Sequence, residues 1–277
     1  MVDLGTGPVA STLEAVQLSL DEMQWLQEKL DIDELPVVLQ AVARYDNADD
    51  RYVALARAAE ALVQRGLVES DQVDHELAER LRTLYRPHWV VALRLFVDDT
   101  VSRLCLAKGD DDRMVLALRG PESYVIDAVH GDPAGPIIAA LGAAKPLELS
   151  GANVPTAHLG EVFDDAGDPR TTAKRLEKIG ANAADAAAIA NAMVHCYAHC
   201  EIVGVIYGDA VRDQADSHIA LFDTRDGRFV MTASKAGDGT KWSALSTGTD
   251  ARLRKALQDL IKVLPDRQDF PHPGVGQ

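Results

Sequence analysis

The sequence predicts an α+β protein in which antiparallel sheets and helices form two related halves about a pseudo-two-fold axis. The chain has 277 residues, of which 47% are hydrophobic, enough for a sizeable core. Its strand-like segments follow one another through short turns, which favours antiparallel pairing because parallel neighbours need long crossovers. One order of elements, helices followed by four short strands and a closing helix, occurs twice along the chain.

The first half is expected to begin with helices. Ser19 and Glu22 have the spacing of a capping box, which marks the start of a helix. The apolar residues that then share one helical face are Leu20, Met23, Leu26 and Leu30. A second helix is expected from Asp49 to Arg65, with Gly66 at the position of a left-handed cap. A third is expected from Asp74 to Leu84.

Four strands and a closing helix are expected to complete this half. The strands are rich in β-branched and aromatic residues and are separated by short Asp- or Gly-containing turns. They are expected at Trp89–Val97, Val101–Ala107, Arg113–Leu118 and Ser123–Val129. The apolar segment from Pro136 to Ala144 is then predicted to be a short helix.

The second half is expected to repeat this order after a connection at 147–169, which is rich in Gly, Pro and Asp. Its helices are expected at Thr171–Ile179 and Ala183–Val194, and a final helix is capped by Thr249. Its strands are expected at Ala198–Tyr207, Ser217–Phe222, Arg228–Ser234 and Lys241–Leu245. Asp226-Gly227 predicts a tight hairpin, whereas Gly208 to Asp216 reads as a polar loop.

These segments divide the chain into parts that we expect to pack as one compact unit. The predicted boundaries are 1–146 for the first half, 147–169 for the connection, 170–265 for the second half and 266–277 for a loose tail.

Charge and composition exclude some classes of function. The formal net charge of −15 disfavours binding to phosphate backbones, so we expect no nucleic-acid partner. The N-terminus lacks the pattern of a secretory signal, and no segment is apolar enough to span a membrane. Three cysteines are too few for a disulfide scaffold. The sequence therefore predicts a reduced cytoplasmic protein without a membrane partner.

The sequence contains no phosphate-binding loop, dinucleotide fingerprint, nucleophile elbow or zincin helix. We therefore expect no enzyme activity and no cofactor. The one local candidate for a metal site is His195-Cys-Tyr-Ala-His-Cys200, which holds two His and two Cys residues. On a strand the two Cys would point to one side and the two His to the other, so structural packing is the favoured interpretation.

The residues also carry a resemblance to the EspG family of proteins. In the first half it rests on Val16-Gln-Leu-Ser-Leu-Asp-Glu-Met-Gln-Trp25, Leu35-Pro-Val-Val-Leu39, Arg65-Gly-Leu-Val68, His88-Trp-Val-Val-Ala-Leu-Arg94 and Met114-Val-Leu-Ala-Leu-Arg119. In the second half it rests on Glu201-Ile-Val-Gly204, Phe222-Asp-Thr-Arg-Asp-Gly-Arg-Phe229, Asp238-Gly-Thr-Lys-Trp242, Ser246-Thr-Gly-Thr249 and Leu264-Pro265. The motifs occur in family order from about Val16 to Pro265.

This resemblance implies an EspG-like fold and an actinobacterial cytosolic chaperone of type VII (ESX) secretion. Such a chaperone binds a PE–PPE heterodimer at the tip of the PPE subunit, keeps it soluble and delivers it to the ESX machinery. In the family the sheet, the loop between the first two strands of the first half and the C-terminal helices contact the client. Here that loop is only Val97-Asp98-Asp99-Thr100, which is short for the family. We therefore expect the strands and Gly208–Asp216 to provide more of the contact with the client. The candidate partner-binding residues are Arg94, Phe96, Asp98, Asp99, Arg103 and Arg212.

Two alternatives from other classes remain. The first is a metal- or ligand-binding regulatory protein that uses the His195–Cys200 segment. The second is an enzyme whose site forms between the two halves; a deep polar pocket with two convergent titratable groups would favour it.

Overall fold

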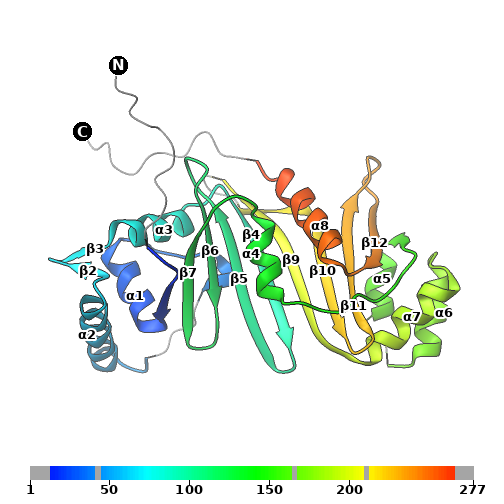
Figure 1. Cartoon of the computed structure of the whole chain (residues 1–277), viewed down its shortest axis with the longest axis horizontal. Helices are drawn as coiled ribbons and strands as arrows, with labels where there is room; N and C mark the ends of the chain where they lie inside the picture. The colour runs from blue at the N-terminus through cyan, green and yellow to red at the C-terminus, as the bar shows by residue number, and fades with distance from the viewer. Residues whose placement is uncertain (1–12, 41–44, 164–166, 209–211, 266–277) are drawn as a thin grey trace, which may run out of the picture.

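A single ten-stranded sheet forms the centre of the molecule (Figure 1). The structure is a computed structural model that describes residues 13–40, 45–163, 167–208 and 212–265. From edge to edge the strand order is β1, β7, β6, β5, β4, β9, β10, β11, β12 and β8. All neighbouring strands are antiparallel. The predicted mixture of helices and antiparallel strands is confirmed.

The first half supplies five strands of this sheet: β1 (Val16–Ser19), β4 (Trp89–Val97), β5 (Thr100–Lys108), β6 (Met114–Arg119) and β7 (Ser123–Val129). Its helices are α1 (Leu20–Lys29), the short 3-10 helix η1 (Val37–Leu39), α2 (Ala48–Gln64), α3 (His75–Tyr85) and α4 (Ala134–Leu141). A small hairpin, β2 (Val68–Glu69) and β3 (Gln72–Val73), joins α2 to α3. The predicted capping box begins α1: the Glu22 N–H donates to Ser19 Oγ at 3.1 Å, and the Ser19 N–H donates to the Glu22 carboxylate at 2.6 Å.

The second half supplies the other five strands: β8 (Ala152–Pro155), β9 (Cys196–Tyr207), β10 (Arg212–Thr224), β11 (Gly227–Lys235) and β12 (Lys241–Thr247). Its helices are α5 (Thr156–Phe163), α6 (Pro169–Lys178), α7 (Ala183–Val194) and α8 (Asp250–Lys262). The β10–β11 hairpin turns at Arg225-Asp226, next to the predicted position. The prediction of a polar loop at Gly208–Asp216 is wrong for residues 212–216, because they belong to β10. Residues 209–211 lie outside the described residues.

The two halves have matching strand orders. Each has its first strand, β1 or β8, at an outer edge of the sheet and its next strand, β4 or β9, at the centre. Such an order is what an internal duplication produces, while the pseudo-two-fold axis itself stays a prediction. Residues 147–169, expected to be a connection, contain β8 and α5, which pack with the second half. The boundaries of the halves likewise stay a prediction.

Backbone pairing between β4 and β9 joins the halves. Every residue of β4 has a partner in β9, from Trp89 opposite Ile206 to Val97 opposite Ala198. The junction between the halves is therefore a ladder of backbone hydrogen bonds. Two separate halves packed against each other would instead meet through side chains.

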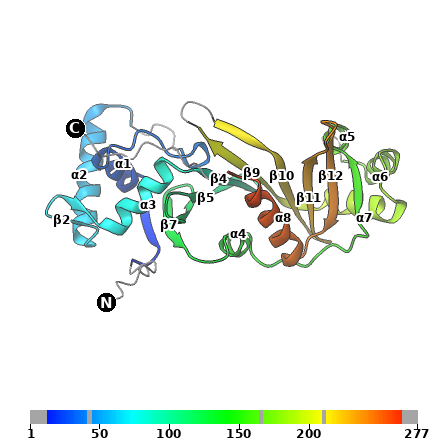
Figure 2. The same cartoon turned by 90° about the horizontal axis from the view of Figure 1, so that it is seen from above.

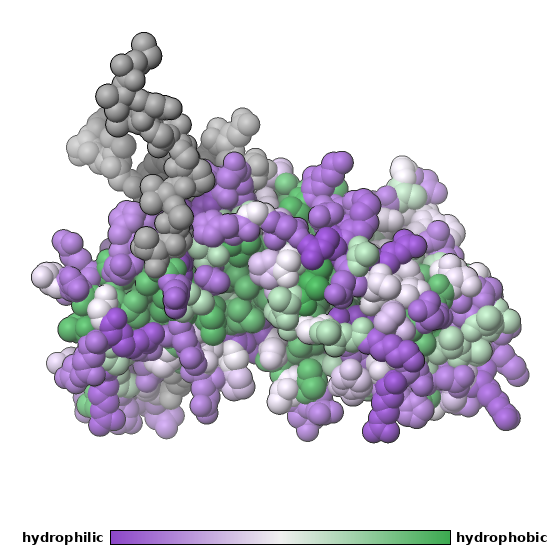
Figure 3. All heavy atoms as spheres, viewed as in Figure 1, coloured by the Kyte–Doolittle hydropathy of each residue, from purple (hydrophilic) through white to green (hydrophobic). Residues whose placement is uncertain are grey.

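Helices cover the two faces of the sheet differently (Figure 2). On one face α4 and α8 pack together over the central strands, with Val91, Ile202 and Val230 beneath them. On the other face α1–α3 cover one end, where Val90 is buried, and α5–α7 cover the other end, where Phe229 is buried. Charged and polar residues line much of the outer rim of the face that carries α4 and α8, and apolar residues show between them over the strands of the first half (Figure 3).

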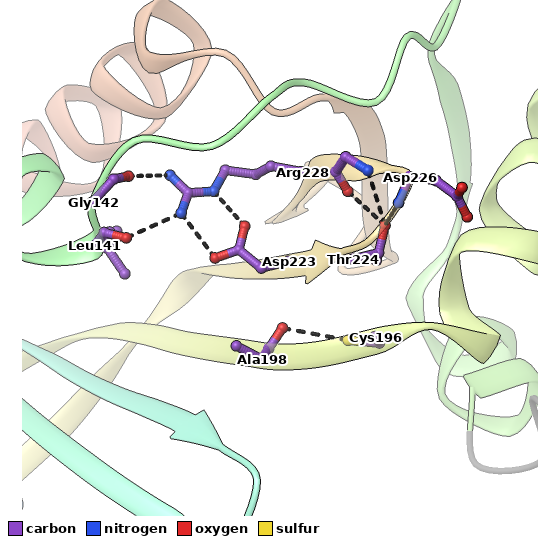
Figure 4. A network of polar contacts seen from close by, with 9 residues as sticks. Leu141, Gly142, Cys196, Ala198, Asp223, Thr224, Asp226 and Arg228 are labelled. Carbon is purple, nitrogen blue, oxygen red and sulfur yellow. Dashed lines mark hydrogen bonds and ion pairs between the residues drawn. The ribbon is translucent and has the colours of Figure 1, made fainter.

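A buried ion pair in the β10–β11 hairpin also fixes this hairpin to the end of α4 in the first half (Figure 4). Arg228 is 2% exposed and binds Asp223 through two hydrogen bonds of 2.6 and 2.8 Å. Its guanidinium also donates to the carbonyl oxygens of Gly142 at 2.9 Å and Leu141 at 3.1 Å, which end α4. Because the last carbonyls of a helix have no partner inside the helix, Arg228 satisfies groups that would otherwise be unpaired.

After α4 the chain passes in direct contact with the β10–β11 hairpin. Backbone hydrogen bonds join Arg228 to Lys145 at 2.7 Å and to Leu147 at 2.8 Å. Gly227 has φ +139°, and a Cβ there would lie 2.7 Å from the carbonyl carbon of Pro146. A glycine is required here for both its backbone conformation and its lack of a side chain.

Within the described ranges, no helix combines the length and the apolar character needed to cross a bilayer.

We predict that Arg228→Met destabilises the fold by about 3–5 kcal/mol, because it leaves the Asp223 carboxylate buried without its charge partner. Urea unfolding followed by circular dichroism measures this loss. The matched control is Arg225→Met, which changes an exposed arginine in the same turn and should cost less than about 0.5 kcal/mol. Equal losses in the two variants would contradict the role given to Arg228.

Candidate functional site

An open groove lies on the face of the sheet opposite α4 and α8. It has a volume of about 720 Å³ and lies over β4, β9 and β10, with η1 and β11 at its sides. Its position follows from the fold: α1–α3 and α5–α7 cover the two ends of this face and leave the central strands uncovered (Figure 2).

The floor of the groove is mainly apolar. Alternation along the strands turns every second residue of β4, β9 and β10 toward it. The apolar side chains that line it include Val37, Val38, Val90, Ala92, Val203, Val205, Ala220, Phe222 and Met231. Val37 at its border is 51% exposed, so the apolar surface of the floor continues onto η1. An uncovered apolar floor of this kind is typical of a surface that binds another protein.

Aromatic rings form one cross-strand row at the β4–β5 turn end of the groove. Register places Phe96 opposite His199, and His199 opposite Phe222. The rings of Phe96 and His199 stack with centroids 4.5 Å apart and planes 9° apart. Phe222 stacks in turn on buried Phe229, with centroids 4.7 Å apart. This row therefore connects the groove to the core under α5–α7.

Charged residues form the neighbouring row. Register places Arg119 of β6 opposite Arg103 of β5, Arg103 opposite Arg94 of β4, and Arg94 opposite Glu201 of β9. Arg94 and Glu201 are exposed and line the groove, while Arg103 and Arg119 are partly exposed beside it. We call these four residues the charged row.

The residues predicted from sequence to bind a partner lie in two places around this groove. Arg94 and Arg212 line it, and Phe96 and Arg103 lie on the same face of the sheet. Asp98 and Asp99 form the exposed two-residue turn between β4 and β5, next to the aromatic row. The structure thus brings Arg94, Phe96 and Arg103 together.

Arg212 contributes more to the wall of the groove than to its floor. Its guanidinium forms an ion pair with Glu34 and lies over the ring of Tyr207, 5.5 Å from the centroid. The hydrogen bond from Arg212 to Glu34 raises the pKa of the guanidinium. Burial raises the pKa of the Tyr207 hydroxyl to about 12. These contacts link the start of β10 to the segment before η1.

Sequence reasoning missed most of the groove lining contributed by β9. His199 and Glu201 are exposed there, whereas Cys200 and Ile202 between them are buried. In the sequence, polar and apolar residues alternate only from His199 to Ile202, and no charged residue follows from Val203 to Tyr207. This short alternation is a signal in the sequence that β9 is buried on one face and exposed on the other.

The His195–Cys200 segment does not gather ligands in the structure. Cys196 Sγ donates to the Ala198 carbonyl oxygen at 3.3 Å, and Cys200 is fully buried under α8 on the opposite face from His199. Over the described part of the chain, no group of three or more His, Cys, Asp or Glu residues is placed to hold a metal ion.

The groove also contains titratable groups that could suggest catalysis. His199, Glu201 and His218 line it, but no hydrogen bond or ion pair joins any two of them in the described structure. A nucleophile or base within hydrogen-bond reach of an activating partner, the arrangement of an acid–base site, is not formed by these three side chains.

Comparison with known proteins identifies relatives along nearly the whole chain. A sequence model of the EspG family matches residues 19–259. The chain is 24% identical to the ESX-1 secretion-associated protein EspG1 of Mycobacterium tuberculosis, over 94% of this chain and 91% of that protein. It is also 24% identical to the ESX-3 secretion-associated protein EspG3 of Mycolicibacterium smegmatis, over 93% of this chain and 89% of that protein.

Among solved structures, the fold resembles the Mycobacterium tuberculosis type VII secretion system chaperone EspG5 in complex with a PE25–PPE41 dimer. The TM-score is 0.75 at 20% sequence identity, covering 91% of this chain and 97% of that one. At this identity the likeness shows a shared fold.

We predict that at most one thiol of the folded protein reacts readily with Ellman's reagent. Burial raises the pKa of all three thiols, and Cys105 and Cys200 are 0% exposed, whereas Cys196 is partly exposed. Unfolding in guanidinium chloride should release the other two. A Cys196→Ser variant should lose the native reaction, and a second fast-reacting thiol in the native protein would contradict the burial of Cys105 or Cys200.

We predict that stability falls as the pH drops from 7 through the ordinary histidine pKa of about 6.5. Burial, together with the positive charge of Lys241, lowers the pKa of His218, so the unfolded chain takes up this proton before the folded one. The loss stops once the pH is below the folded-state pKa. His218→Gln should flatten this part of a Tm-against-pH curve, whereas His75→Gln, at an exposed position, should leave it unchanged.

Proposed function

The chain belongs to the EspG family, and on this premise we propose that it is a chaperone of a type VII (ESX) secretion system that binds a PE–PPE heterodimer at the tip of the PPE subunit. The chaperone keeps the heterodimer soluble in the cytoplasm and delivers it to the ESX machinery. The relatives are secretion-associated proteins by name, and the related EspG5 chain was solved with a PE25–PPE41 dimer.

The open apolar groove is the observation that carries this proposal. Three adjacent strands, β4, β9 and β10, form its floor. Neighbouring strands lie about 4.8 Å apart, so the outer two of the three are about 10 Å apart. A helix with its side chains is about 10–12 Å in diameter. The uncovered floor therefore has the width of one helical tip.

Apolar burial supplies the affinity that this role needs. A secreted helical pair with an apolar tip would associate with itself in water, and covering the tip removes that surface. Each aliphatic side chain of the client that becomes fully buried contributes about 1.5–3 kcal/mol. The net charge of −15 on the chaperone then keeps the complex soluble. The proposed function needs binding and release alone, without catalysis.

We propose that the predicted partner-binding residues contact the client from the rim. Arg94 and Phe96 project from β4 and Arg103 from β5 on the groove side of the sheet. Asp98 and Asp99 extend the rim at the β4–β5 turn, and Arg212 extends it at the start of β10. The two halves of the chain act as one unit, because β4 and β9 both belong to the floor.

We predict that coexpression with PE–PPE heterodimers from the same genome yields a stable complex containing one copy of each chain, measured by size-exclusion chromatography with light scattering. Val203→Gln places a polar side chain in the floor and should weaken binding by about 30-fold or more, as expected for the centre of an interface.

The matched control is Val53→Gln, which makes the same change at an exposed position of α2 that is 47% exposed. It should bind as the wild-type protein does. Failure of the wild-type protein to bind any pair from its genome would overturn the proposed function. Equal binding by both variants would overturn the assignment of the groove.

A further inference from the structure

The charged row places three positive charges side by side on a strongly acidic protein. Arg119, Arg103 and Arg94 are direct cross-strand neighbours, so their Cβ atoms are about 4.5–5.5 Å apart. Like charges in this position are destabilising. Such an arrangement requires an opposing charge to become favourable.

Among the described residues, no ion pair relieves this repulsion. No described carboxylate lies within 4 Å of the guanidinium of Arg94, Arg103 or Arg119. Arg103 donates only to the carbonyl oxygen of Val101, at 3.3 Å, and the Nε of Arg119 is buried without a hydrogen-bond partner. Other arginines are paired: Arg65 with Glu22, Arg113 with Glu79 and Arg254 with Asp132. Beside the groove, Arg212 is paired with Glu34, whereas Arg94, Arg103 and Arg119 have no such partner in the described part of the chain.

The charged row changes sign at the centre of the sheet. Glu201 stands opposite Arg94, but the two side chains form no ion pair in the described structure. The row thus presents positive charge over β4, β5 and β6 and negative charge over β9. Arg94 and Glu201 lie within the groove, so this polarity crosses the surface where the client is proposed to bind.

We propose that the charged row orients the client by charge: acidic side chains next to the client's apolar tip lie over Arg94, Arg103 and Arg119, and a basic side chain lies over Glu201. This inference rests on the proposed function and adds the chemistry of the partner. The apolar floor gives affinity without direction, because burial of apolar surface is non-directional. Complementary charges beside it fix the register, reject clients of the wrong polarity and speed association.

The paired strands hold the four residues of the charged row in fixed positions. Each of the four side chains starts from a hydrogen-bonded strand whose register is fixed on both sides. Little backbone order has to be gained when the client arrives, which limits the entropy lost on binding.

The test compares the wild-type protein with a combined Arg94→Ala, Arg103→Ala and Arg119→Ala variant. The probe is a PE–PPE heterodimer that the wild-type protein binds, and association rate and Kd are measured at several NaCl concentrations. We expect the variant to bind about 10- to 100-fold more weakly at low salt and to lose most of the salt dependence of the association rate. Arg57→Ala, at an exposed position of α2, is the control and should bind as the wild type.

A charge reversal tests the orientation. Arg103→Glu should weaken binding by about 100-fold, and replacing an acidic residue beside the client's tip with Lys should restore at least about tenfold of this loss. Thermal unfolding of each variant confirms that it is folded.

Three results separate the outcomes. If the triple variant binds with wild-type affinity and salt dependence while Val203→Gln binds weakly, the inference is overturned and the proposed function stands. If no acidic-to-Lys substitution beside the client's tip restores binding to the Arg103→Glu variant, the proposed orientation is overturned. If the wild-type protein binds no PE–PPE heterodimer, the proposed function and this inference fail together.

Discussion

Pairing between β4 and β9 is the interaction on which the rest of the structure depends. It runs the full length of β4 and turns two five-stranded halves into one continuous sheet. On one face, α1–α3 of the first half and α5–α7 of the second pack at the two outer parts, so their separation is set by the strands that remain between them. The groove is thus a product of the sheet, and no mobile loop is needed to build its floor.

The opposite face explains how the centre of the sheet can stay uncovered on one side. There α4 and α8 bury the central strands, and Arg228 ties the end of α4 to the β10–β11 hairpin. A strand buried on one face already gains most of its packing, and an antiparallel sheet can expose its other face. One covered face therefore stabilises the strands, which leaves the second face available for a partner.

Local signals in the sequence predicted most of the elements, whereas the arrangement of the halves was harder to predict. The capping box at Ser19, the cap at Gly66 and the helix from Ala183 to Val194 depend on neighbouring residues, and all three are present in the structure. β8 and α5 were missed because Gly and Pro around them suggested a connection. The groove lining depends on which face the distant helices leave open, and alternation within a single strand does not determine that. The charged row needs the register of four strands, which no single motif provides.

The edges of the sheet have a consequence for a protein that handles apolar clients. The outermost strands, β1 and β8, are each only four residues long, and β8 ends in Pro155, whose nitrogen carries no hydrogen. An extended segment from another molecule therefore finds few free backbone groups to pair with at either end. Growth of the sheet by addition of further strands, a common route to fibrils, is therefore disfavoured at both ends. The apolar groove thus lies in the middle of one face, away from the strand edges at which other chains could pair.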